Sequence, residues 1–304
     1  MKVYICDEAS HHKNKESIRN MMVANNIPYT ECNDLSQLDD TYDIVFCCTK
    51  YFPPYMFPSK CKVIYGPQFF VFPDNASHPI HQHSHDPNRF FFNILTNWIV
   101  KIYKEMAPQL QIQYLACPLG IDIENIKVTR PIEERTKVML YSKGRHPSCI
   151  QKALRVLETN GESVIQIQYG SYKDHEFKAL LQDTKFVLWV GCHESQGFAF
   201  QETLASNVPI LVWDVQSMYD EYNNNEYIYE SYKQKGYSLT ATTANCWSEE
   251  CGIKIDSEDQ LDEAVKTMNA NLSKFQPRAF LQPKLSLKSS FQYILEQIHY
   301  EKSF

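Results

Sequence analysis

The stretch that decides the fold is CHESQGFAFQETLASNVPILVWD, residues 192–214. An apolar run, KFVLWVG at 185–191, comes before it, and a second run, PILVWD at 209–214, ends it. Between the two runs, residues 198–206 have the composition of a helix. Short apolar runs rich in β-branched and aromatic side chains are typical of parallel strands buried on both faces. The stretch therefore predicts a strand–helix–strand unit of an α/β protein.

The same alternation of apolar runs and helical stretches extends along the whole chain. Further strands are expected in KVYIC (2–6), YDIVFCC (42–48), KVIYG (62–66), KVMLYS (137–142) and SVIQIQYG (163–170), with shorter ones in IPYTEC (27–32) and IQYLACPLGID (112–122) and an extended segment in LTATT (239–243). Helices are expected at 15–25, 90–106, 147–159, 174–183, 256–272 and 286–300. This alternation predicts parallel sheets covered by helices.

A polar segment, IENIKVTRPIEERT at 123–136, separates two series of strands and helices. It has no sustained apolar period, which is typical of a connection between domains. We therefore expect an N-terminal domain over 1–122, a C-terminal domain over 123–285 and a final helical segment over 286–304. That last helix carries an apolar stripe at i, i+3, i+4 and i+7, and the stripe needs a surface to cover: Phe291, Ile294, Leu295 and Ile298.

Composition and charge argue against several classes of protein. A formal net charge of −6 over 304 residues argues against a general nucleic-acid binder, which needs a basic surface. No stretch approaches the length of a membrane span, and MKVYICDEAS at the start lacks the apolar core of a signal peptide. The 10 cysteines are scattered without a C-x-x-C pair, which indicates reduced thiols and no structural zinc site.

Two carboxylates in the quoted stretch indicate one kind of ligand. Glu194 follows a predicted strand, at the edge where parallel sheets bind ligands, and Glu202 lies eight positions further on, inside the predicted helix. The turn between them, Ser195-Gln196-Gly197, leads to a helix start, whose N–H groups attract phosphate. Carboxylates suit hydroxyls instead, so the arrangement predicts a diphosphate with diols at both ends, which describes a nucleotide sugar. The alternative is an ordinary helix with one N-terminal acid and one solvated acid.

The surroundings of the two acids make the pattern more specific. The spacing Glu-x7-Glu, followed by LASNVPILVW (204–213), resembles the donor site of GT-B glycosyltransferases, above all the retaining family-4 type. Three further segments agree with that family in order: PLGID (118–122), VMLYSKGR (138–145) and CGIKIDSEDQLDEAV (251–265). The chain departs from the family pattern at Gln196, Thr203 and Asn207, where Phe, Ala and Gly are usual. The N-terminal third matches only in its rhythm of strands, and the compact form is similar to enzymes of bacteria and large DNA viruses.

The resemblance implies a role for each matching residue. Glu202 is expected to bind the ribose hydroxyls of the donor, and Glu194 to contact the 3- and 4-hydroxyls of its sugar. The N–H groups of Gly197 and Phe198 are expected to face the diphosphate, with Ser195 and Gln196 beside them. Arg145 matches the arginine that the family places on the diphosphate.

The second cation of the diphosphate site departs from the family pattern. The family has a lysine five residues after the arginine, but that position is Ile150 here. Lys143 is therefore assigned this role, with Lys152 as the alternative. Cations are required because two phosphates and two acids cannot share a site without neutralising charge. A solvated basic turn is the alternative interpretation of SKGR (142–145).

Two segments of the N-terminal domain are candidates for the acceptor side. Gly66 directly follows a predicted strand, and Gln68 is expected to touch donor or acceptor, although a simple strand-ending turn is the alternative. The segment SHPIHQHSHD (77–86) holds four histidines, among which His78 and His81 are candidate contacts of the donor sugar or the acceptor. Their spacing fits no common zinc motif, so a polar loop is favoured over a metal site.

The resemblance implies a GT-B fold, with two Rossmann-like domains whose parallel sheets face a cleft and a C-terminal helix that crosses back to the first domain. Such an enzyme moves a hexose, deoxyhexose or pentose from a UDP- or GDP-sugar to a glycan or glycolipid hydroxyl, with retention. The chain has no D-x-D motif, so no metal cofactor is expected.

Two further expectations follow, together with an alternative mechanism and two alternative functions. We expect a cytoplasmic enzyme, in the host-cell cytoplasm if the protein is viral, that is a monomer or a weak homodimer. If the reaction inverted the anomeric centre instead, Asp7 or a histidine of 77–86 would have to act as the base. A nucleotide-sugar epimerase and a non-catalytic nucleotide-sugar-binding protein are the alternative functions.

Overall fold

The chain divides into two compact units. A computed structural model describes residues 1–67, 73–74, 76–77, 79–222 and 226–300. Unit 1 consists of residues 1–122 together with 285–304, and unit 2 consists of residues 123–284. Each unit has its own parallel sheet, and α-helices connect every pair of consecutive strands in unit 2 but only β1 to β2 and β5 to β6 in unit 1. The predicted α/β class with two Rossmann-like parallel sheets is therefore confirmed.

The sheet of unit 1 has six parallel strands in the order β2-β1-β3-β4-β5-β6. The strands are β1 Val3–Cys6, β2 Tyr29–Cys32, β3 Ile44–Cys47, β4 Lys62–Tyr65, β5 Phe90–Asn93 and β6 Gln113–Leu115. Val3 of β1 lies opposite Tyr29 of β2 on one side and Ile44 of β3 on the other. Every residue of β1 and β3 is buried, as the unbroken apolar runs predict for strands covered on both faces.

The strand β5 corrects the predicted helix over 90–106. Residues Phe90–Asn93 form a buried strand between β4 and β6, and the helix α2 begins only at Asn97 and ends at Met106. Three consecutive phenylalanines suit a pleated surface that is covered on both faces. Leu95 has a positive φ of 69°, which turns the chain out of the sheet before the helix starts. The prediction wrongly extended the helix over this strand, because periodicity alone does not distinguish a short apolar strand from the helix that follows it.

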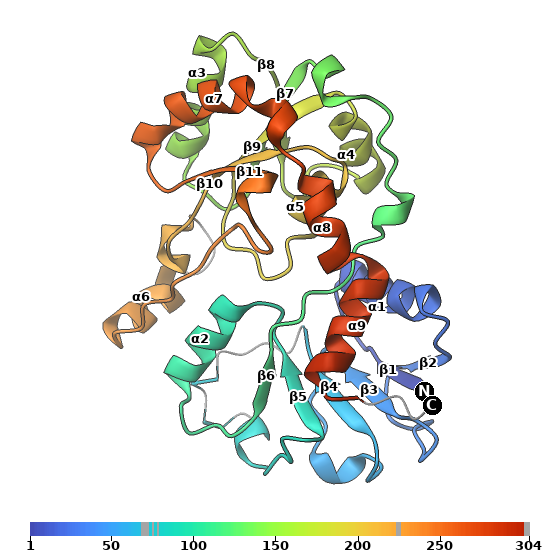
Figure 1. The fold of residues 1–304 in the computed structure, drawn as a ribbon. Helices are drawn as coiled ribbons and strands as arrows, with labels where there is room; N and C mark the ends of the chain where they lie inside the picture. The colour runs from blue at the N-terminus through green and yellow to red at the C-terminus, as the bar shows by residue number, and fades with distance from the viewer. Residues whose placement is uncertain (68–72, 75, 78, 223–225, 301–304) are drawn as a thin grey trace. The chain divides into compact units, whose positions relative to one another are not determined.

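The remaining helices of unit 1 bring the two ends of the chain together. Helix α1 runs over His12–Ala24 and helix α9 over Leu287–Gln297, with short 3-10 turns at Pro54–Met56 and Pro79–His81. Figure 1 shows α9 alongside α1, with which it makes direct contacts. The four residues of the apolar stripe are all buried, at 4% exposure or less: Phe291, Ile294, Leu295 and Ile298. The start of α9 also lies close to the backbone at Gly120, since a Cβ added to Gly120 would lie 2.8 Å from Cα of Leu287.

The sheet of unit 2 has five parallel strands in the order β11-β10-β9-β7-β8. They are β7 Lys137–Ser142, β8 Ser163–Gln168, β9 Thr184–Val190, β10 Ile210–Trp213 and β11 Gly252–Ile255. The α-helices are α3 Pro147–Thr159, α4 Asp174–Leu181, α5 Phe198–Ala205, α6 Glu226–Gln234, α7 Leu261–Ala270 and α8 Pro277–Leu285. The 3-10 turns lie at Ile123–Asn125, Ile132–Glu134, Met218–Asp220, Glu249–Cys251, Glu258–Gln260 and Leu272–Lys274.

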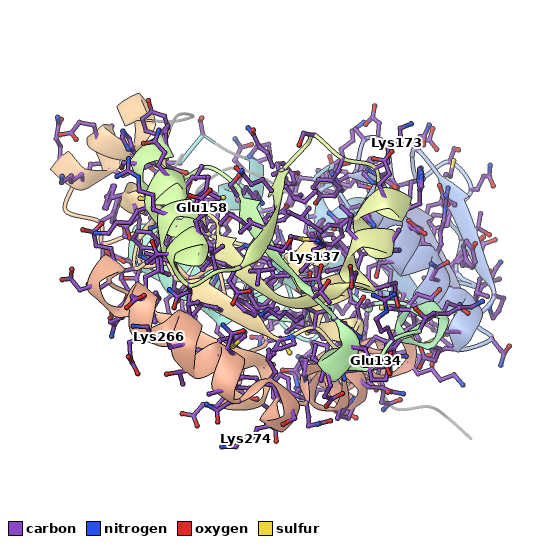
Figure 2. The ribbon with its side chains drawn as sticks, turned by 90° about the horizontal axis from the view of Figure 1, so that it is seen from above. Glu134, Lys137, Glu158, Lys173, Lys266 and Lys274 are labelled. Atoms are coloured by element: carbon purple, nitrogen blue, oxygen red, sulfur yellow. The ribbon has the colours of Figure 1, made fainter. Side chains whose placement is uncertain are left out.

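The core of unit 2 follows from alternation along its strands. Val138 and Leu140 of β7 join one cluster with Leu157 of α3 and Val265 of α7. The ring of Tyr141 points to the other face, where it stacks on Trp189 of β9 with centroids 3.9 Å apart. Charged side chains such as Glu158 and Lys266 stay on the exposed outer sides of α3 and α7 (Figure 2).

Four elements of unit 2 were missing from the prediction or began elsewhere. The strand β11 and the helices α6 and α8 were not expected. Helix α7 begins at Leu261 rather than at 256, because Ser257 and Gln260 form a capping box around the 3-10 turn before it. Among the described residues, no helix has the length and the apolar character needed to cross a membrane.

Candidate functional site

Three loops of unit 2 meet at one edge of its sheet. They follow β7, β9 and β10, which are neighbours and run parallel, so that their carboxyl ends lie together. The loop after β7 carries Lys143 and Arg145, the loop after β9 carries Glu194, and Asp214 follows β10 directly. This is the edge at which open parallel sheets bind their ligands.

Lys143 and Glu194 form an ion pair across this edge. The ammonium of Lys143 lies 2.7 Å from Oε1 of Glu194, and the two side chains are 21% and 11% exposed. The same ammonium lies 4.6 Å from the centroid of the Tyr169 ring. Burial lowers the pKa of Lys143, but the charge and hydrogen bond of Glu194, together with smaller effects of Cys192 and Tyr169, raise the pKa above its usual value. An ammonium has three donors, so the pair also leaves it able to bind a phosphate oxygen.

The main chain of Glu194 is held by a network that starts at Asp214. Its N–H donates to the carbonyl of Thr242 over 3.1 Å, and its carbonyl accepts from the side-chain amide of Asn245. The buried carboxylate of Asp214 in turn accepts from the Thr242 hydroxyl over 2.7 Å and from the Thr243 N–H over 2.7 Å. Asp214 therefore fixes the segment that positions Glu194.

Arg145 is buried beside the same loops. Its Nη1 donates to the carbonyls of Gly191, over 3.3 Å, and Trp213, over 3.2 Å, and its guanidinium lies 5.3 Å from the centroid of the Trp213 ring. Within the described part of the chain these contacts engage Nη1 alone, so Nε and Nη2 retain donors for an anionic ligand.

The predicted turn before α5 leads directly into the start of that helix. Gly197 is the N-cap of α5 and adopts the left-handed region, with φ 71° and ψ 51°. A Cβ at this position would lie 3.2 Å from Cβ of Glu194, so glycine also permits the close approach of the two residues. The side chain of Gln196 is buried and donates to Oε1 of Gln201 over 2.7 Å, whereas Ser195 and Phe198 are half-buried. The N–H groups of the first turn have no acceptor within the helix itself.

Glu202 lies inside α5 and has a cation of its own. Its carboxylate is 3.4 Å from the ammonium of Lys178 on α4, and the side chains are 9% and 43% exposed. The alternative cation, Lys152, lies on α3 and pairs with Glu258 at 2.7 Å, with both side chains exposed. Among the described residues, Lys143 thus pairs with Glu194 and Lys178 with Glu202, whereas Lys152 pairs with Glu258.

The acceptor-side candidates are only partly described. Gln68 and His78 lie outside the described residues. Gly66, in unit 1, has a positive φ of 101°, and a Cβ there would meet the carbonyl oxygen of Asn93, so packing of the backbone alone explains this glycine. A ring nitrogen of His81 lies 2.8 Å from the carbonyl of Pro73. No cluster of three or more His, Cys, Asp or Glu side chains suited to a metal ion occurs among the residues that the structure describes.

Several residues at this edge were not predicted from the sequence. Asp214 had one usable signal, because it directly follows a predicted strand. No such signal in the sequence exists for Lys178, Thr242 or Asn245, because each reaches the edge through contacts between segments far apart in the chain. Cys192 is also present at the edge, but burial raises the pKa of its thiol to about 12, which keeps it protonated near neutral pH.

Comparison with known proteins identifies the fold. No protein-family model and no curated protein sequence matches the chain. Among solved structures, the apo form of the lipopolysaccharide outer core galactosyltransferase WaaB is 11% identical at a TM-score of 0.50, over 98% of this chain and 99% of WaaB. WaaG, a glycosyltransferase involved in lipopolysaccharide biosynthesis, is 10% identical at a TM-score of 0.46, over 99% and 100% of the two chains. A glycosyltransferase involved in avilamycin A biosynthesis is 8% identical at a TM-score of 0.49, over 98% and 96%.

The likeness to WaaB extends over both units and shows that this chain has the GT-B fold. The resemblance inferred from the motifs around Glu194 and Glu202 is thus confirmed at the level of the fold. An identity of 11% carries no statement about donor, acceptor or mechanism.

Proposed function

We propose that this protein is a glycosyltransferase that uses a nucleoside-diphosphate sugar, with UDP or GDP as the nucleotide, to glycosylate a hydroxyl of a glycan or glycolipid. One observation carries the proposal. Two acids, each with a lysine beside it, flank a left-handed turn and a helix start at the carboxyl edge of a parallel sheet. Acids bind hydroxyls, and lysines and helix starts bind phosphate, so the edge offers groups for both parts of a nucleotide sugar.

In this proposal the donor's diphosphate lies against Lys143, Arg145 and the start of α5. The Lys143 ammonium neutralises Glu194 and keeps two further donors, which suit the phosphate next to the sugar. Nε and Nη2 of Arg145 suit a second phosphate oxygen, because its Nη1 is already committed to the backbone. The N–H groups of Gly197 and Phe198 add positive dipoles. Lys143 and Arg145 supply fixed positive charge without a metal ion.

The two acids then hold the hydroxyl groups of the donor. Glu202 binds the ribose diol, and Lys178 lowers the cost of keeping this carboxylate charged in a largely buried position. Glu194 binds hydroxyls of the transferred hexose, deoxyhexose or pentose, with its main chain fixed by Thr242 and Asn245. The turn residues Ser195 and Gln196 position the helix start between the two acids. Both carboxylates thus contact uncharged parts of the donor, which are the ribose and the transferred sugar.

The chemical step transfers the sugar with retention at its anomeric carbon. The bond between that carbon and the donor's phosphate oxygen breaks, and a bond to the acceptor oxygen forms. The acceptor's proton goes to the leaving phosphate oxygen, so no side-chain base is required. Negative charge grows on the leaving nucleoside diphosphate during the step, and preorganised cations stabilise it there. Lys143 and Arg145 are therefore the residues that we propose to lower the barrier.

The remaining parts of the proposal concern the acceptor and the setting of the enzyme. Gly66, Gln68, His78 and His81 remain proposed contacts on the acceptor side. We further propose that the enzyme works in the cytoplasm, in the host cell if the protein is viral, as a monomer or a weak homodimer. No cofactor other than the nucleotide-sugar substrate is part of this proposal.

Incubation with UDP-, GDP- and dTDP-sugars tests the proposed function. A transferase without its acceptor slowly releases free sugar and nucleoside diphosphate, which chromatography separates from the intact donor. Hydrolysis of one donor in preference to the others is the expected result. An epimerised nucleotide sugar would identify an epimerase instead. Binding without any turnover, with or without a glycan acceptor, would identify a non-catalytic binding protein.

A further inference from the structure

Tyr169 is an exposed aromatic residue at the same edge of unit 2, and it has no part in the function proposed above. It directly follows β8, the strand beside β7. Its N–H donates to the carbonyl of Ser142 over 2.9 Å, and Ser142 ends β7 immediately before Lys143. The residue is nevertheless 52% exposed. A fixed backbone thus keeps a large aromatic side chain in solvent beside the proposed phosphate ligands.

A cation holds the ring of Tyr169, and the turn beside it is open. The ammonium of Lys143 lies 4.6 Å from the ring centroid, which is within the range of a cation–π attraction. The hydroxyl of Tyr169 makes no hydrogen bond to any residue that the structure describes, so the hydroxyl does not fix the ring. Gly170 follows with a positive φ of 82°, and a Cβ there would meet nothing within 4 Å. The chain therefore leaves space next to the ring at this turn.

The loop that begins with Tyr169 also reaches the acid that we assign to the ribose. Tyr172, in the same loop, stacks on Phe177 of α4 with ring centroids 5.0 Å apart. Burial raises the pKa of Tyr172, and the negative charge of nearby Glu202 contributes to the rise. The helix α4 also carries Lys178, which pairs with Glu202. The loop therefore runs from the proposed phosphate ligands to the proposed ribose ligand.

The function proposed above leaves the nucleobase of the donor without a contact. Glu194, Lys143 and Glu202 are assigned to the transferred sugar, the diphosphate and the ribose. The base is bonded to the ribose, so it lies within reach of the loop between Tyr169 and Tyr172. A nucleobase is planar, aromatic and uncharged, and an aromatic side chain that stacks on its face is a common partner. Tyrosine supplies such a ring at a low cost in conformational entropy, because its side chain has only two χ angles.

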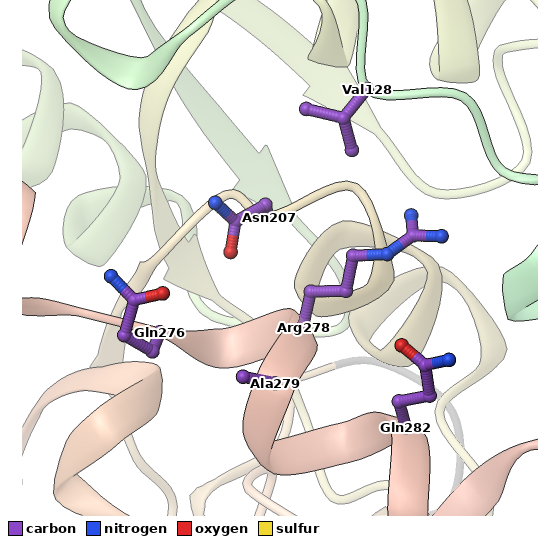
Figure 3. A pocket seen from close by; sticks show the side chains of 6 residues that line it. All are labelled: Val128, Asn207, Gln276, Arg278, Ala279 and Gln282. Carbon is purple, nitrogen blue, oxygen red and sulfur yellow. The ribbon is translucent and has the colours of Figure 1, made fainter.

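A hollow elsewhere in unit 2 offers no aromatic ring. Its volume is about 370 Å³, and six residues line it (Figure 3): Val128, Asn207, Gln276, Arg278, Ala279 and Gln282. Arg278 donates to the carbonyls of Ile123, Ile126 and Ala205, so its guanidinium is engaged by the backbone. Asn207 precedes β10, which places this residue at the amino end of that strand rather than at the carboxyl edge. Among these residues, Tyr169 is therefore the better partner for a base.

We propose that Tyr169 is a nucleobase-stacking residue of the donor site. The base of the nucleoside diphosphate lies against the exposed ring, while Lys143 holds the ring and binds a phosphate oxygen. The proposal rests on the function proposed above, because Lys143 and Glu202 are what place a nucleotide beside this loop. Every base has a face that can stack, so the ring strengthens binding of UDP and GDP alike, and the choice between the two bases depends on other contacts.

Substitutions of this tyrosine separate stacking on a base from the contact with Lys143. Tyr169→Ala removes the ring, Tyr169→Phe keeps it, and Tyr169→Trp adds a fluorophore at the same position. The probes are UDP and GDP in calorimetric titrations, and inorganic pyrophosphate, which has no base, in displacement of the bound nucleotide. Two control variants remove an exposed side chain elsewhere: Tyr55→Ala, at a residue of unit 1 that is 79% exposed, and Gln282→Ala, in the hollow of unit 2.

The expected result is a loss that depends on the presence of a base. Tyr169→Ala binds the preferred nucleotide about 5- to 100-fold more weakly, which is the range for the loss of one base–aromatic stack, but binds pyrophosphate within about twofold of the parent. Tyr169→Phe and both control variants bind the nucleotide within about twofold of the parent. In Tyr169→Trp, titration with the nucleotide changes the fluorescence of the added indole.

Several results would overturn this inference while leaving the proposed function in place. These are an Ala variant that binds nucleotide as tightly as the parent, a Phe variant as weak as the Ala variant, and equal losses for nucleotide and pyrophosphate. A loss for UDP-glucose and GDP-mannose without a loss for UDP and GDP would show that the ring contacts the transferred sugar instead. A parent that binds neither UDP nor GDP would overturn the proposed function as well.

Discussion

The ammonium of Lys143 lies 2.7 Å from a carboxylate oxygen of Glu194, and this contact joins the loops that follow two neighbouring strands, β7 and β9. The pair places a cation beside the acid that we assign to the sugar. A phosphate that binds here meets a lysine with two free donors instead of a bare carboxylate. In the proposed function, the pair would let one edge of the sheet hold an anionic diphosphate and two acids together.

Replacing Lys143 should weaken nucleotide binding strongly. In Lys143→Gln the phosphate loses a charge-assisted hydrogen bond and faces an unneutralised Glu194, so UDP and GDP should bind about 10- to 100-fold more weakly, or about 1.5–3 kcal/mol. Lys152→Gln is the matched control, because Lys152 is an exposed lysine that pairs with Glu258 on the surface. Isothermal titration measures both variants. Equal affinities for Lys143→Gln and the parent would remove Lys143 from the site.

Activity should persist in an excess of EDTA. Lys143, Arg145 and the start of α5 are proposed to supply the positive charge that a metal ion supplies in other transferases. Release of nucleoside diphosphate is followed with and without the chelator, on protein that has been dialysed against it. Complete loss of activity that Mn²⁺ or Mg²⁺ restores would show that the diphosphate is held in a different way.

The extent to which the sequence predicted the fold depends on the length and continuity of its apolar runs. Strand β7 and helix α3 match their predicted ranges, 137–142 and 147–159, because each has one clear period and clear ends. Strand β5 was missed because three phenylalanines stand next to a real helix. Strand β11 is no shorter than β1 or β3, but the exposed Lys254 interrupts its apolar run, whereas every residue of β1 and β3 is buried.

The candidate site was predictable only where its residues follow one another in the chain. Glu194, Gly197 and Glu202 belong to one strand–turn–helix unit, so their spacing identifies them. Lys178 and Thr242 reach the same edge from other segments, and their contacts depend on how those segments fold. Sequence spacing contains no information about such contacts. The hydrogen bonds from Arg145 to two backbone carbonyls could not be predicted from the sequence either.

Removal of the last helix should unfold unit 1 while leaving unit 2 able to bind nucleotide. The four buried residues of the α9 stripe contribute at most about 1.5–3 kcal/mol each, and their loss would expose the covered face of α1. A chain that ends at Leu285 should therefore aggregate and lose transfer activity, whereas the isolated fragment 123–285 should still bind nucleotide weakly. A chain that ends at Tyr300 keeps α9 and is the control. Limited proteolysis and activity are the measurements, and a soluble, fully active product of the shorter truncation would contradict the account.

Unit 1 should lose stability in mild acid through a single buried histidine. His85 is 6% exposed, and its ring nitrogen Nε2 lies 2.9 Å from the hydroxyl of Tyr51. Burial, together with the proximity of His83, lowers the pKa of His85 from 6.5 to about 4. Between pH 6.5 and pH 4 the histidine is therefore protonated in the unfolded chain and neutral in the folded chain. The free energy of unfolding is highest above pH 6.5 and falls as the pH is lowered toward 4, by about 3 kcal/mol at most.

The substitution His85→Asn tests this pH dependence. Urea unfolding of the parent and the variant is measured at several pH values between 4 and 7. The variant should be less stable at pH 7 but should lose less stability on acidification than the parent. His175→Asn, at an exposed position on α4, should keep the parent's dependence. Parallel curves for the parent and His85→Asn would show that His85 does not titrate in this way.

The most direct test of the central claim, that the carboxyl edge of unit 2 binds a nucleoside diphosphate, is a calorimetric titration of UDP and GDP into the parent and into Glu202→Ala. The parent should bind one of the two nucleotides at a single site. Glu202→Ala should bind it more weakly by about 1.5–3 kcal/mol, because the ribose diol loses charge-assisted hydrogen bonds to a carboxylate. The fold should survive, and Glu158→Ala on the exposed side of α3 should change nothing. A Glu202→Ala variant that binds UDP and GDP as tightly as the parent would contradict the account.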